Sequence, residues 1–278
     1  MSSIVIDRLT ASLGAEMVGV NLKDAVNDQT LQEEIRNALA EYSVLTFRAQ
    51  FLDDETQIAV AEFFGDTMLH PIVAALGSDN PVEPIEDSPT SLPDREGWHT
   101  DAPFLSRPPS VAVLRAVTVP PTGGDTLWVS TAAAYDLLSE SMQQFFSGLH
   151  VSYPPAQGLF DYVSEHMDEQ VASRVSELVG AGAEHPLVVT HPITARRCLY
   201  FARGFAERII ELTDEESSML WPFLDRLVSN VGIQCRWRWH EGDVVIWDEI
   251  ATQHSGAADH RGETRVMRRV AAVRPPVS

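Results

Sequence analysis

The sequence predicts a mainly β protein with helices on its outside. Short, apolar, β-branched segments gather in two groups, one in the first half and one in the final third, and a largely helical region separates them. No internal repeat and no linker divides the 278 residues, and β barrels or sandwiches commonly fill this length as one domain. We therefore expect a single domain over residues 1–278, built as an antiparallel barrel or jelly roll.

The N-terminal part supplies the first strands and helices. Three short segments are expected to be strands: 4–8, 15–22 and 43–47. Two amphipathic segments are expected to be helices, over 28–41 and from 53 or 54 to 64. Asp28 and Asp53 or Asp54 suit the N-caps, and Gly65 suits the end of the second helix.

Residues 70–97 contain five prolines among polar residues, with one candidate strand at 82–86. A loop of this length in a compact domain is usually functional or disordered. Because it leads directly into Trp98-His99-Thr100-Asp101, we expect a lid or a pocket wall, with disorder as the alternative.

The rest of the chain alternates strands with three helices. Strands are expected at 110–119, 126–129, 187–190, 198–203, 234–239, 244–247 and 265–273. Helices are expected at 131–148, 161–179 and 213–230, the last capped by Thr213. Four histidines scattered among these segments are interpreted as surface or satisfied side chains: His150, His166, His185 and His191.

The net charge of the chain limits the classes of binding partner that we expect. Forty acidic against 20 basic residues give a formal net charge of −20, which argues against nucleic acid or an anionic membrane. A small anionic ligand would need a locally positive region in this acidic chain. Five arginines near the C-terminus supply one: Arg261, Arg265, Arg268, Arg269 and Arg274. The N-terminus does not resemble a signal peptide, and the two cysteines suit a reducing compartment, so we expect a cytoplasmic protein.

One motif indicates a metal. In an extended segment His99 and Asp101 leave the same face, so both can bind one ion. His254 is the candidate third ligand. Two histidines and one carboxylate form the facial triad that suits Fe(II) and leaves coordination positions open, whereas a structural zinc site would usually use cysteines. The alternative is a surface turn with an incidental histidine.

Arg265 and Arg269 share one face of the last expected strand, and Arg268 points to the other face. Their Cα atoms would lie about 13 Å apart at the usual rise per residue. This spacing suits two separate anions, because arginine binds planar oxyanions in a fork geometry. The alternative is a pair of surface arginines with acidic partners.

Together these motifs resemble the taurine dioxygenase family of Fe(II)/2-oxoglutarate-dependent oxygenases, and the similarity runs almost end to end. The residues that carry it are Trp98-His99-Thr100-Asp101, Thr122 to Trp128, Arg236-Trp237-Arg238-Trp239, Val244 to Asp248, Thr252-Gln253-His254, Arg265 and Arg269. The resemblance implies a double-stranded β-helix (jelly roll) core. Members of this family often form dimers or tetramers, so the resemblance also implies a homo-oligomer.

The resemblance also implies the residue roles. His99, Asp101 and His254 would hold Fe(II), and 2-oxoglutarate would chelate the iron with its far carboxylate on Arg265 and Thr126. O₂ would then oxidise 2-oxoglutarate to succinate and CO₂ and hydroxylate a nearby C–H bond of the substrate. The residues implied around a small anionic substrate are His70, Val73, Asp94, Arg95, Phe160, Phe205 and Arg269.

Two positions depart from the taurine pattern. Members that use taurine are expected to carry tyrosine and asparagine where this chain has Val73 and Arg95, although Asp94 matches. A cation beside the taurine ammonium group is electrostatically unfavourable. We therefore expect an organic sulfonate with a less cationic tail, oxidised to an aldehyde and sulfite, with a sulfate ester or a carboxylate as alternatives. A non-redox, cupin-like metal protein and a catalytically silent anion-binding protein are the alternatives from other classes.

Overall fold

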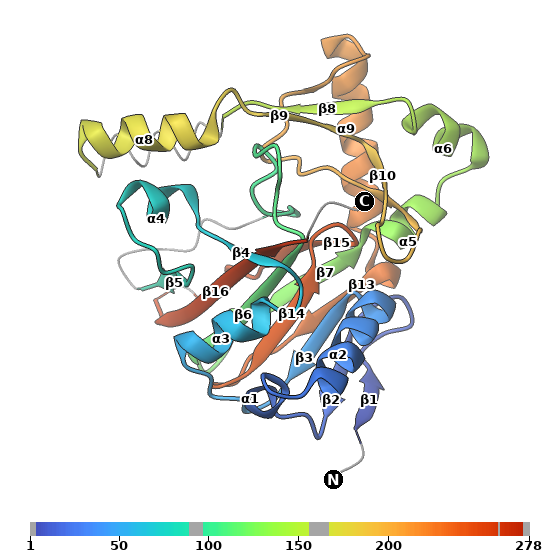
Figure 1. Ribbon diagram of the computed structural model, residues 1–278. Helices are drawn as coiled ribbons and strands as arrows, with labels where there is room; N and C mark the ends of the chain where they lie inside the picture. Colours follow the sequence, from blue (N-terminus) through green and yellow to red (C-terminus); the bar gives the residue numbers. More distant parts are fainter. Residues whose placement is uncertain (1–3, 89–96, 156–166, 261, 275–278) are drawn as a thin grey trace.

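A computed structural model describes residues 4–88, 97–155, 167–260 and 262–274 of the chain (Figure 1). The largest sheet has eight strands. Seven of them follow the order β1-β2-β3-β14-β6-β16-β4, and the eighth, β5, lies off this order and pairs with β16. Its strands are β1 (Val5–Arg8), β2 (Ala15–Val18), β3 (Val44–Phe47), β4 (Asp66–Met68), β5 (Glu83–Asp87), β6 (Val111–Thr118), β14 (Val244–Asp248) and β16 (Arg265–Val273).

A three-stranded sheet in the order β13-β7-β15 accompanies the large sheet. Its strands are β7 (Thr126–Ser130), β13 (Gln234–Trp237) and β15 (Thr252–Gly256). The chain passes between the two sheets from β6 to β7, from β13 to β14, from β14 to β15 and from β15 to β16. Trp128 of the small sheet and Trp247 of the large one pack with ring centroids 5.7 Å apart. Alternate residues of the central strands thus fill a core that both sheets share.

Helices cover the other face of the large sheet: α1 (Leu22–Ala25), α2 (Gln29–Tyr42) and α3 (Asp54–Ala61) (Figure 1). The Asp28 carboxylate accepts from the Leu31 amide, and the Asp53 carboxylate accepts from the Thr56 amide. These caps start α2 and α3 as expected. The apolar faces of the helices then bury Ile35 and Val60 against the sheet.

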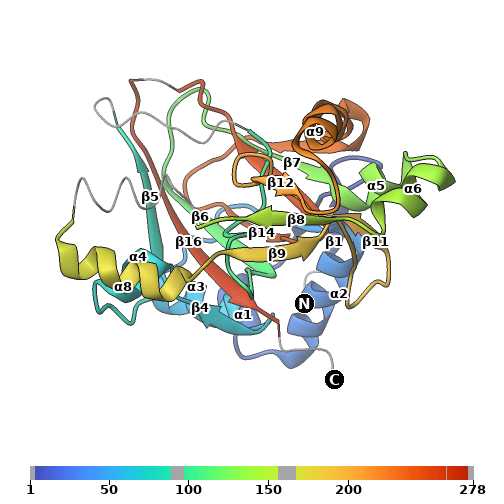
Figure 2. The ribbon, with the colours of Figure 1, turned by 90° about the horizontal axis from the view of Figure 1, so that it is seen from above.

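The region between β7 and β13 forms a second layer over the open end of the sheets, and Figure 2 shows it from above. It holds α5 (Thr131–Asp136), α6 (Glu140–Phe146), β8 (His150–Tyr153), α8 (Glu169–Val179), β9 (Ala183–Pro186), β10 (Val188–Thr190), β11 (Arg197–Leu199), β12 (Arg208–Ile209), α9 (Asp214–Val228) and η1 (Val231–Ile233). A sheet in the order β12-β8-β9 and the pair β10-β11 organise this layer around a core of its own.

Most of the expected elements are confirmed, and the differences have local causes. The helix expected over 131–148 is wrong: it is two helices, because the Ser139 side chain caps a new helix by accepting from the Met142 amide. The strand expected over 15–22 ends at Val18, since Asn21 caps α1. The strand expected over 198–203 ends at Leu199. The strands β4, β8, β9, β12 and β15 were not expected.

Two expected segments are described only in part. Of residues 70–97, the structure describes α4 (Pro71–Ala75) and β5, so the expected loop carries a helix and a strand; residues 89–96 lie outside the described ranges. The first part of the helix expected over 161–179 also lies outside them, and the remainder is α8. The architecture is mixed α/β. None of the helices within the described ranges is long and apolar enough to cross a bilayer.

Candidate metal centre and its cavity

A backbone bridge brings two remote parts of the chain together. The His99 amide donates to the His254 carbonyl at 3.1 Å, and the His254 amide donates to the His99 carbonyl at 2.8 Å. His254 lies within β15, a strand that was not expected from the sequence. This antiparallel bridge sets the two imidazoles side by side, with ring centroids 4.2 Å apart.

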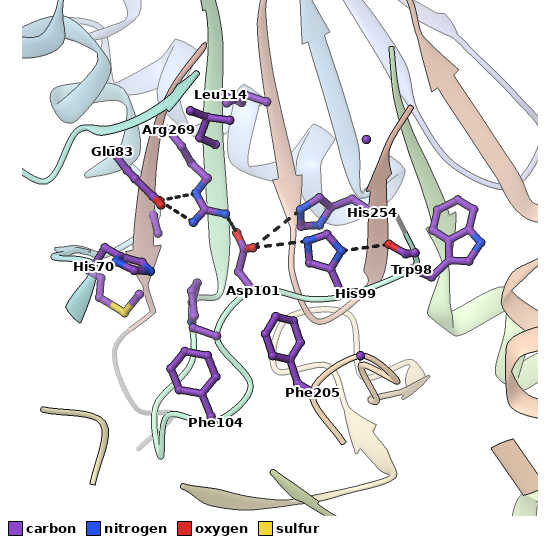
Figure 3. Close-up of a pocket in the computed structure, with 18 of the residues that line it drawn as sticks. His70, Glu83, Trp98, His99, Asp101, Phe104, Leu114, Phe205, His254 and Arg269 are labelled. Atoms are coloured by element: carbon purple, nitrogen blue, oxygen red, sulfur yellow. Dashed lines mark hydrogen bonds and ion pairs between the residues drawn. The ribbon is translucent and has the colours of Figure 1, made fainter. Parts of the chain in front are cut away.

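The Asp101 carboxylate completes the group (Figure 3). Its Oδ1 lies 3.9 Å from His99 Nε2 and 3.8 Å from His254 Nε2. One ligand atom from each of the three residues lies within 4.8 Å of the others. Two imidazole nitrogens and one carboxylate oxygen at this spacing fit a single metal ion, and the donor set suits Fe(II) with further positions open.

A buried carboxyl group fixes the turn that carries Asp101. Glu249 is fully buried and accepts from the Thr100 hydroxyl at 2.8 Å and from the Asp101 amide at 3.1 Å. Its other oxygen accepts from the Trp247 indole at 2.7 Å. Burial, reinforced by the nearby Asp101 charge, raises the pKa of Glu249 well above its usual value. Three donors thus hold Glu249 against the backbone that carries Asp101.

Arg269 lies beside Asp101, on the side away from His99 and His254 (Figure 3). Its Nη1 donates to Asp101 Oδ2, while Nε and Nη2 donate to Glu83 Oε2 at 2.9 and 2.5 Å. Burial alone would raise the pKa of Asp101, but Arg269 and the two imidazoles outweigh burial and lower that pKa. Asp101 is therefore held as an anion, the form in which a carboxylate binds metal.

The second arginine of β16 lies beside Thr126. Arg265 is buried, its Nε donates to the Gly124 carbonyl at 3.0 Å, and its Nη1 lies 3.9 Å from Asp87 Oδ2. Gly124 has a φ of +70°, and a Cβ there would stand 3.0 Å from Arg265 Cδ, so this close approach needs glycine. Trp239 Nε1 donates to Thr126 Oγ1 at 3.0 Å. Since Oγ1 accepts this bond, the Thr126 hydroxyl keeps its own proton to donate elsewhere.

Strand β5 places an acid beside each arginine of β16. In the antiparallel register Arg265 lies opposite Asp87, and Arg269 lies opposite Glu83. Arg268, on the other face, pairs with Glu86 at 2.8 Å. The arginines do have acidic partners, as one sequence alternative held, but Arg265 and Arg269 line a cavity instead of the surface.

This cavity has a volume of about 900 Å³ and contains the three candidate ligands, Thr126, Arg265 and Arg269 in its wall. Much of the remaining wall is apolar: Met68, Ile85, Trp98, Phe104, Leu114 and Phe205. His70 also lines it, and its Nδ1 accepts from the Ile72 amide at 3.3 Å. Burial lowers the pKa of His70, so the neutral ring has its proton on Nε2.

Of the residues expected around the substrate, the structure brings His70, Phe205 and Arg269 into this cavity. Val73 lies on α4 and is not part of the described wall. Asp94, Arg95 and Phe160 lie outside the described residues. Their roles stay predictions.

Sequence reasoning assigned no site role to Glu83, Asp87, Trp239 and Glu249, although Trp239 belongs to a motif that carries the family resemblance. Glu83 and Asp87 stand four positions apart in β5, as Arg265 and Arg269 do in β16, and this matched spacing of acids and arginines on one strand face was a usable signal. Trp239 and Glu249 carried no such signal, because their partners are set by the packing of the two sheets.

Comparison with known proteins identifies the class. Residues 6–271 match the family described as "Taurine catabolism dioxygenase TauD, TfdA family". The chain is 33% identical over 269 residues to an Acinetobacter baylyi protein described as an alkylsulfatase, covering 95% of this chain and 83% of that protein. It is 33% identical over 264 residues to an alpha-ketoglutarate-dependent sulfate ester dioxygenase of Pseudomonas putida, covering 93% and 85%.

The fold is similar as well. A crystal structure of a taurine dioxygenase from Burkholderia xenovorans matches with a TM-score of 0.82 and 31% identity, covering 98% of this chain and 92% of that one. The match extends over both sheets and the layer above them. Together with the convergence of His99, Asp101 and His254, it leads to one conclusion: the chain belongs to the TauD/TfdA family of Fe(II)- and 2-oxoglutarate-dependent dioxygenases.

Proposed function

We propose that this dioxygenase oxidises the carbon that bears the sulfur group of a small alkyl sulfate ester or alkyl sulfonate with an apolar tail. The observation that carries the proposal is a single cavity in which the candidate triad, the partly buried Arg269 beside it and apolar walls meet. The sulfate-ester and alkylsulfatase relatives support a substrate of this class. The passage of the chain between the two sheets supports a double-stranded β-helix core within one domain.

The roles of the residues follow from their positions. His99, Asp101 and His254 would hold Fe(II), which supplies the activation of O₂ that oxidises 2-oxoglutarate to succinate and CO₂ and inserts one oxygen atom into a substrate C–H bond. Arg265 and the Thr126 hydroxyl would bind the far carboxylate of 2-oxoglutarate, because both are donors on the same side of the cavity.

Arg269 and His70 would bind the anionic head of the substrate. Two of the five N–H groups of Arg269 remain after its bonds to Asp101 and Glu83, and the proton on His70 Nε2 is a third donor. These donors would keep the head away from the metal while the tail packs on Phe104 and Phe205. Positioning of this kind supplies much of the rate in such reactions.

Hydroxylation releases the sulfur group. On the hydroxylated carbon, the O–H bond gives up its proton, the oxygen forms a second bond to carbon, and the bond to the head group breaks with its electron pair. An alkyl sulfate would yield an aldehyde and sulfate, and an alkyl sulfonate would yield an aldehyde and sulfite.

The test is a product assay with Fe(II), ascorbate, 2-oxoglutarate and O₂ on alkyl sulfates, alkyl sulfonates and taurine. We expect sulfate or sulfite in equal amount to succinate from at least one alkyl compound, and slower turnover of taurine. Turnover of taurine alone would contradict the proposed tail. Release of sulfate without 2-oxoglutarate would instead favour a metal-dependent hydrolase.

A further inference from the structure

We propose that Glu83 is a specificity-determining residue of the substrate cavity, which neutralises Arg269 and makes the head-group subsite select monoanionic heads over dianionic heads. A sulfonate or a sulfate monoester is the first kind of head, and a phosphate monoester near pH 8 is the second. The inference rests on the proposed function of Arg269 and names the charge that its subsite accepts.

The position of Glu83 carries the first step. Alternation along β5 turns Glu83, Ile85 and Asp87 inward and leaves Pro84 and Glu86 exposed. Glu83 and Ile85 both line the cavity. Glu83 is thus part of the cavity wall and not only a surface partner of Arg269.

The second step is charge. Glu83 Oε2 accepts from both Nε and Nη2 of Arg269, so a full carboxylate charge lies against the guanidinium. Asp101 accepts from Nη1 of the same guanidinium. One cation therefore lies between two anions, and an incoming head would meet no net positive charge on Arg269.

The third step is the absence of a compensating cation in the described wall. His70 faces the same space, but burial lowers its pKa and its Nδ1 is occupied as an acceptor, so it contributes a neutral donor. Arg265 lies beside Thr126 and Asp87 on the cofactor side. Within the part of the chain that the structure describes, hydrogen bonds to Arg269 and His70 can hold a head, but no surplus charge attracts a second negative charge.

The short distance between the Glu83 carboxylate and a bound head makes their repulsion large. An anion on the free N–H groups of Arg269 would lie about 5–6 Å from the Glu83 carboxylate, by ordinary hydrogen-bond lengths. The Coulomb energy is proportional to the charge of the head, so the repulsion of a dianion by Glu83 is about twice that of a monoanion. Removal of the charge should therefore multiply dianion affinity by about the square of its effect on monoanion affinity.

The test uses Glu83→Gln, which keeps the length of the side chain and an oxygen that can accept from Arg269. Hexyl sulfate and hexyl phosphate are titrated at pH 8 into enzyme loaded with Fe(II) and 2-oxoglutarate without O₂, and Kd is measured by calorimetry. The matched control is Glu86→Gln, because Glu86 lies on the same strand with the same charge but pairs with Arg268 on the outer face. Thermal unfolding of each variant checks that the fold is intact.

We expect the wild type to bind hexyl sulfate more tightly than hexyl phosphate. Glu83→Gln should lower the Kd of hexyl sulfate roughly tenfold and that of hexyl phosphate by about the square of that factor, while Glu86→Gln should change neither more than about twofold. The hydration of each ligand cancels in the ratio of variant to wild type.

Several results would overturn the inference. It fails if Glu83→Gln lowers the Kd of both ligands by the same factor, or if this variant binds them more weakly than the wild type. It also fails if Glu86→Gln shows the same changes in Kd, or if the wild type binds the two ligands equally tightly. If the wild type oxidises alkyl sulfates but shows any of these results, only the role of Glu83 fails. If the wild type binds neither ligand, the proposed function fails first and the inference fails with it.

Discussion

The indole N–H of Trp239 donates to the hydroxyl oxygen of Thr126 at 3.0 Å, and both groups are buried. The bond occupies a lone pair of Oγ1 and prevents the hydroxyl from turning that lone pair toward the cavity. Its proton is therefore directed at the space where we place the far carboxylate of 2-oxoglutarate. Trp239 would act on the co-substrate through Thr126 without touching it.

The substitution Trp239→Phe tests this relationship. It removes one hydrogen bond worth about 1 kcal/mol, so we expect the affinity for the co-substrate 2-oxoglutarate to fall about threefold to tenfold, with unchanged Fe(II) affinity. Anaerobic titration of the Fe(II)-loaded enzyme measures both. Trp237→Phe is the matched control, because Trp237 Nε1 is buried but has no hydrogen-bond partner among the described residues. A similar change in both variants would indicate a packing effect.

The candidate triad gives the second prediction. His99→Ala leaves two of three ligands, so we expect Fe(II) affinity to fall by more than the roughly 10–100-fold that loss of an outer partner costs. Succinate formation should be abolished, while thermal unfolding of the metal-free protein should change little, because the bridge to His254 uses backbone atoms. His150→Ala is the control, since His150 is half-exposed and pairs with Glu211 at 2.7 Å. Retention of Fe(II) affinity by His99→Ala would remove His99 from the site.

The candidate ligand pair His99 and Asp101 could be predicted from the sequence because its signal is local. His99 and Asp101 stand two apart, and the strand expected over 265–273 coincides with β16, in which Arg265 and Arg269 share a face. The helix expected over 131–148 failed because a serine cap outweighed continuous apolar spacing.

The supporting contacts could not be read in the same way. Glu83 and Arg269 are 186 positions apart, and only the register of β5 on β16 brings them together. Glu249 meets Thr100 across 149 positions, through the packing of two loops. The sequence thus predicted which groups converge at the candidate metal centre, whereas the charges and donors that surround them depend on strand register.

A buried charge cluster distant from the metal centre gives a pH prediction. Asp248 is fully buried, accepts from His191 Nε2 at 2.9 Å and pairs with Arg274 at 2.5 Å. Burial raises the pKa of Asp248, but His191 and Arg274 outweigh burial and lower it from 3.8 to about 2. Because the folded pKa lies below the unfolded one, the stabilisation is present above about pH 4 and is lost as the pH falls toward 2.

The substitution Asp248→Asn should remove this stabilisation. We expect the free energy of unfolding at pH 7 to fall by about 2 kcal/mol, which corresponds to the shift in pKa. Urea unfolding followed by tryptophan fluorescence measures it, and the variant should lose less stability than the wild type on acidification. Asp136→Asn is the control, because Asp136 pairs with Arg196 in an exposed ion pair that should contribute little. Equal losses in the two variants would contradict the role of burial.

The apolar wall of the cavity predicts how turnover depends on the length of the substrate tail. Each methylene moved from water to an apolar wall gains about 0.8 kcal/mol, so KM for alkyl sulfates should fall roughly threefold to fourfold per added carbon until the cavity of about 900 Å³ is filled.

Phe205 lines this cavity, and its ring packs 6.0 Å from that of Phe104 and 6.3 Å from that of His99. Phe205→Ala should therefore raise KM for hexyl sulfate about tenfold and flatten the dependence on length. The internal control is the dependence of the rate on the concentration of 2-oxoglutarate, which should stay unchanged because Arg265 and Thr126 are untouched. A KM that is independent of tail length in the wild type would place the tail outside this wall and would refute the apolar part of the proposed substrate.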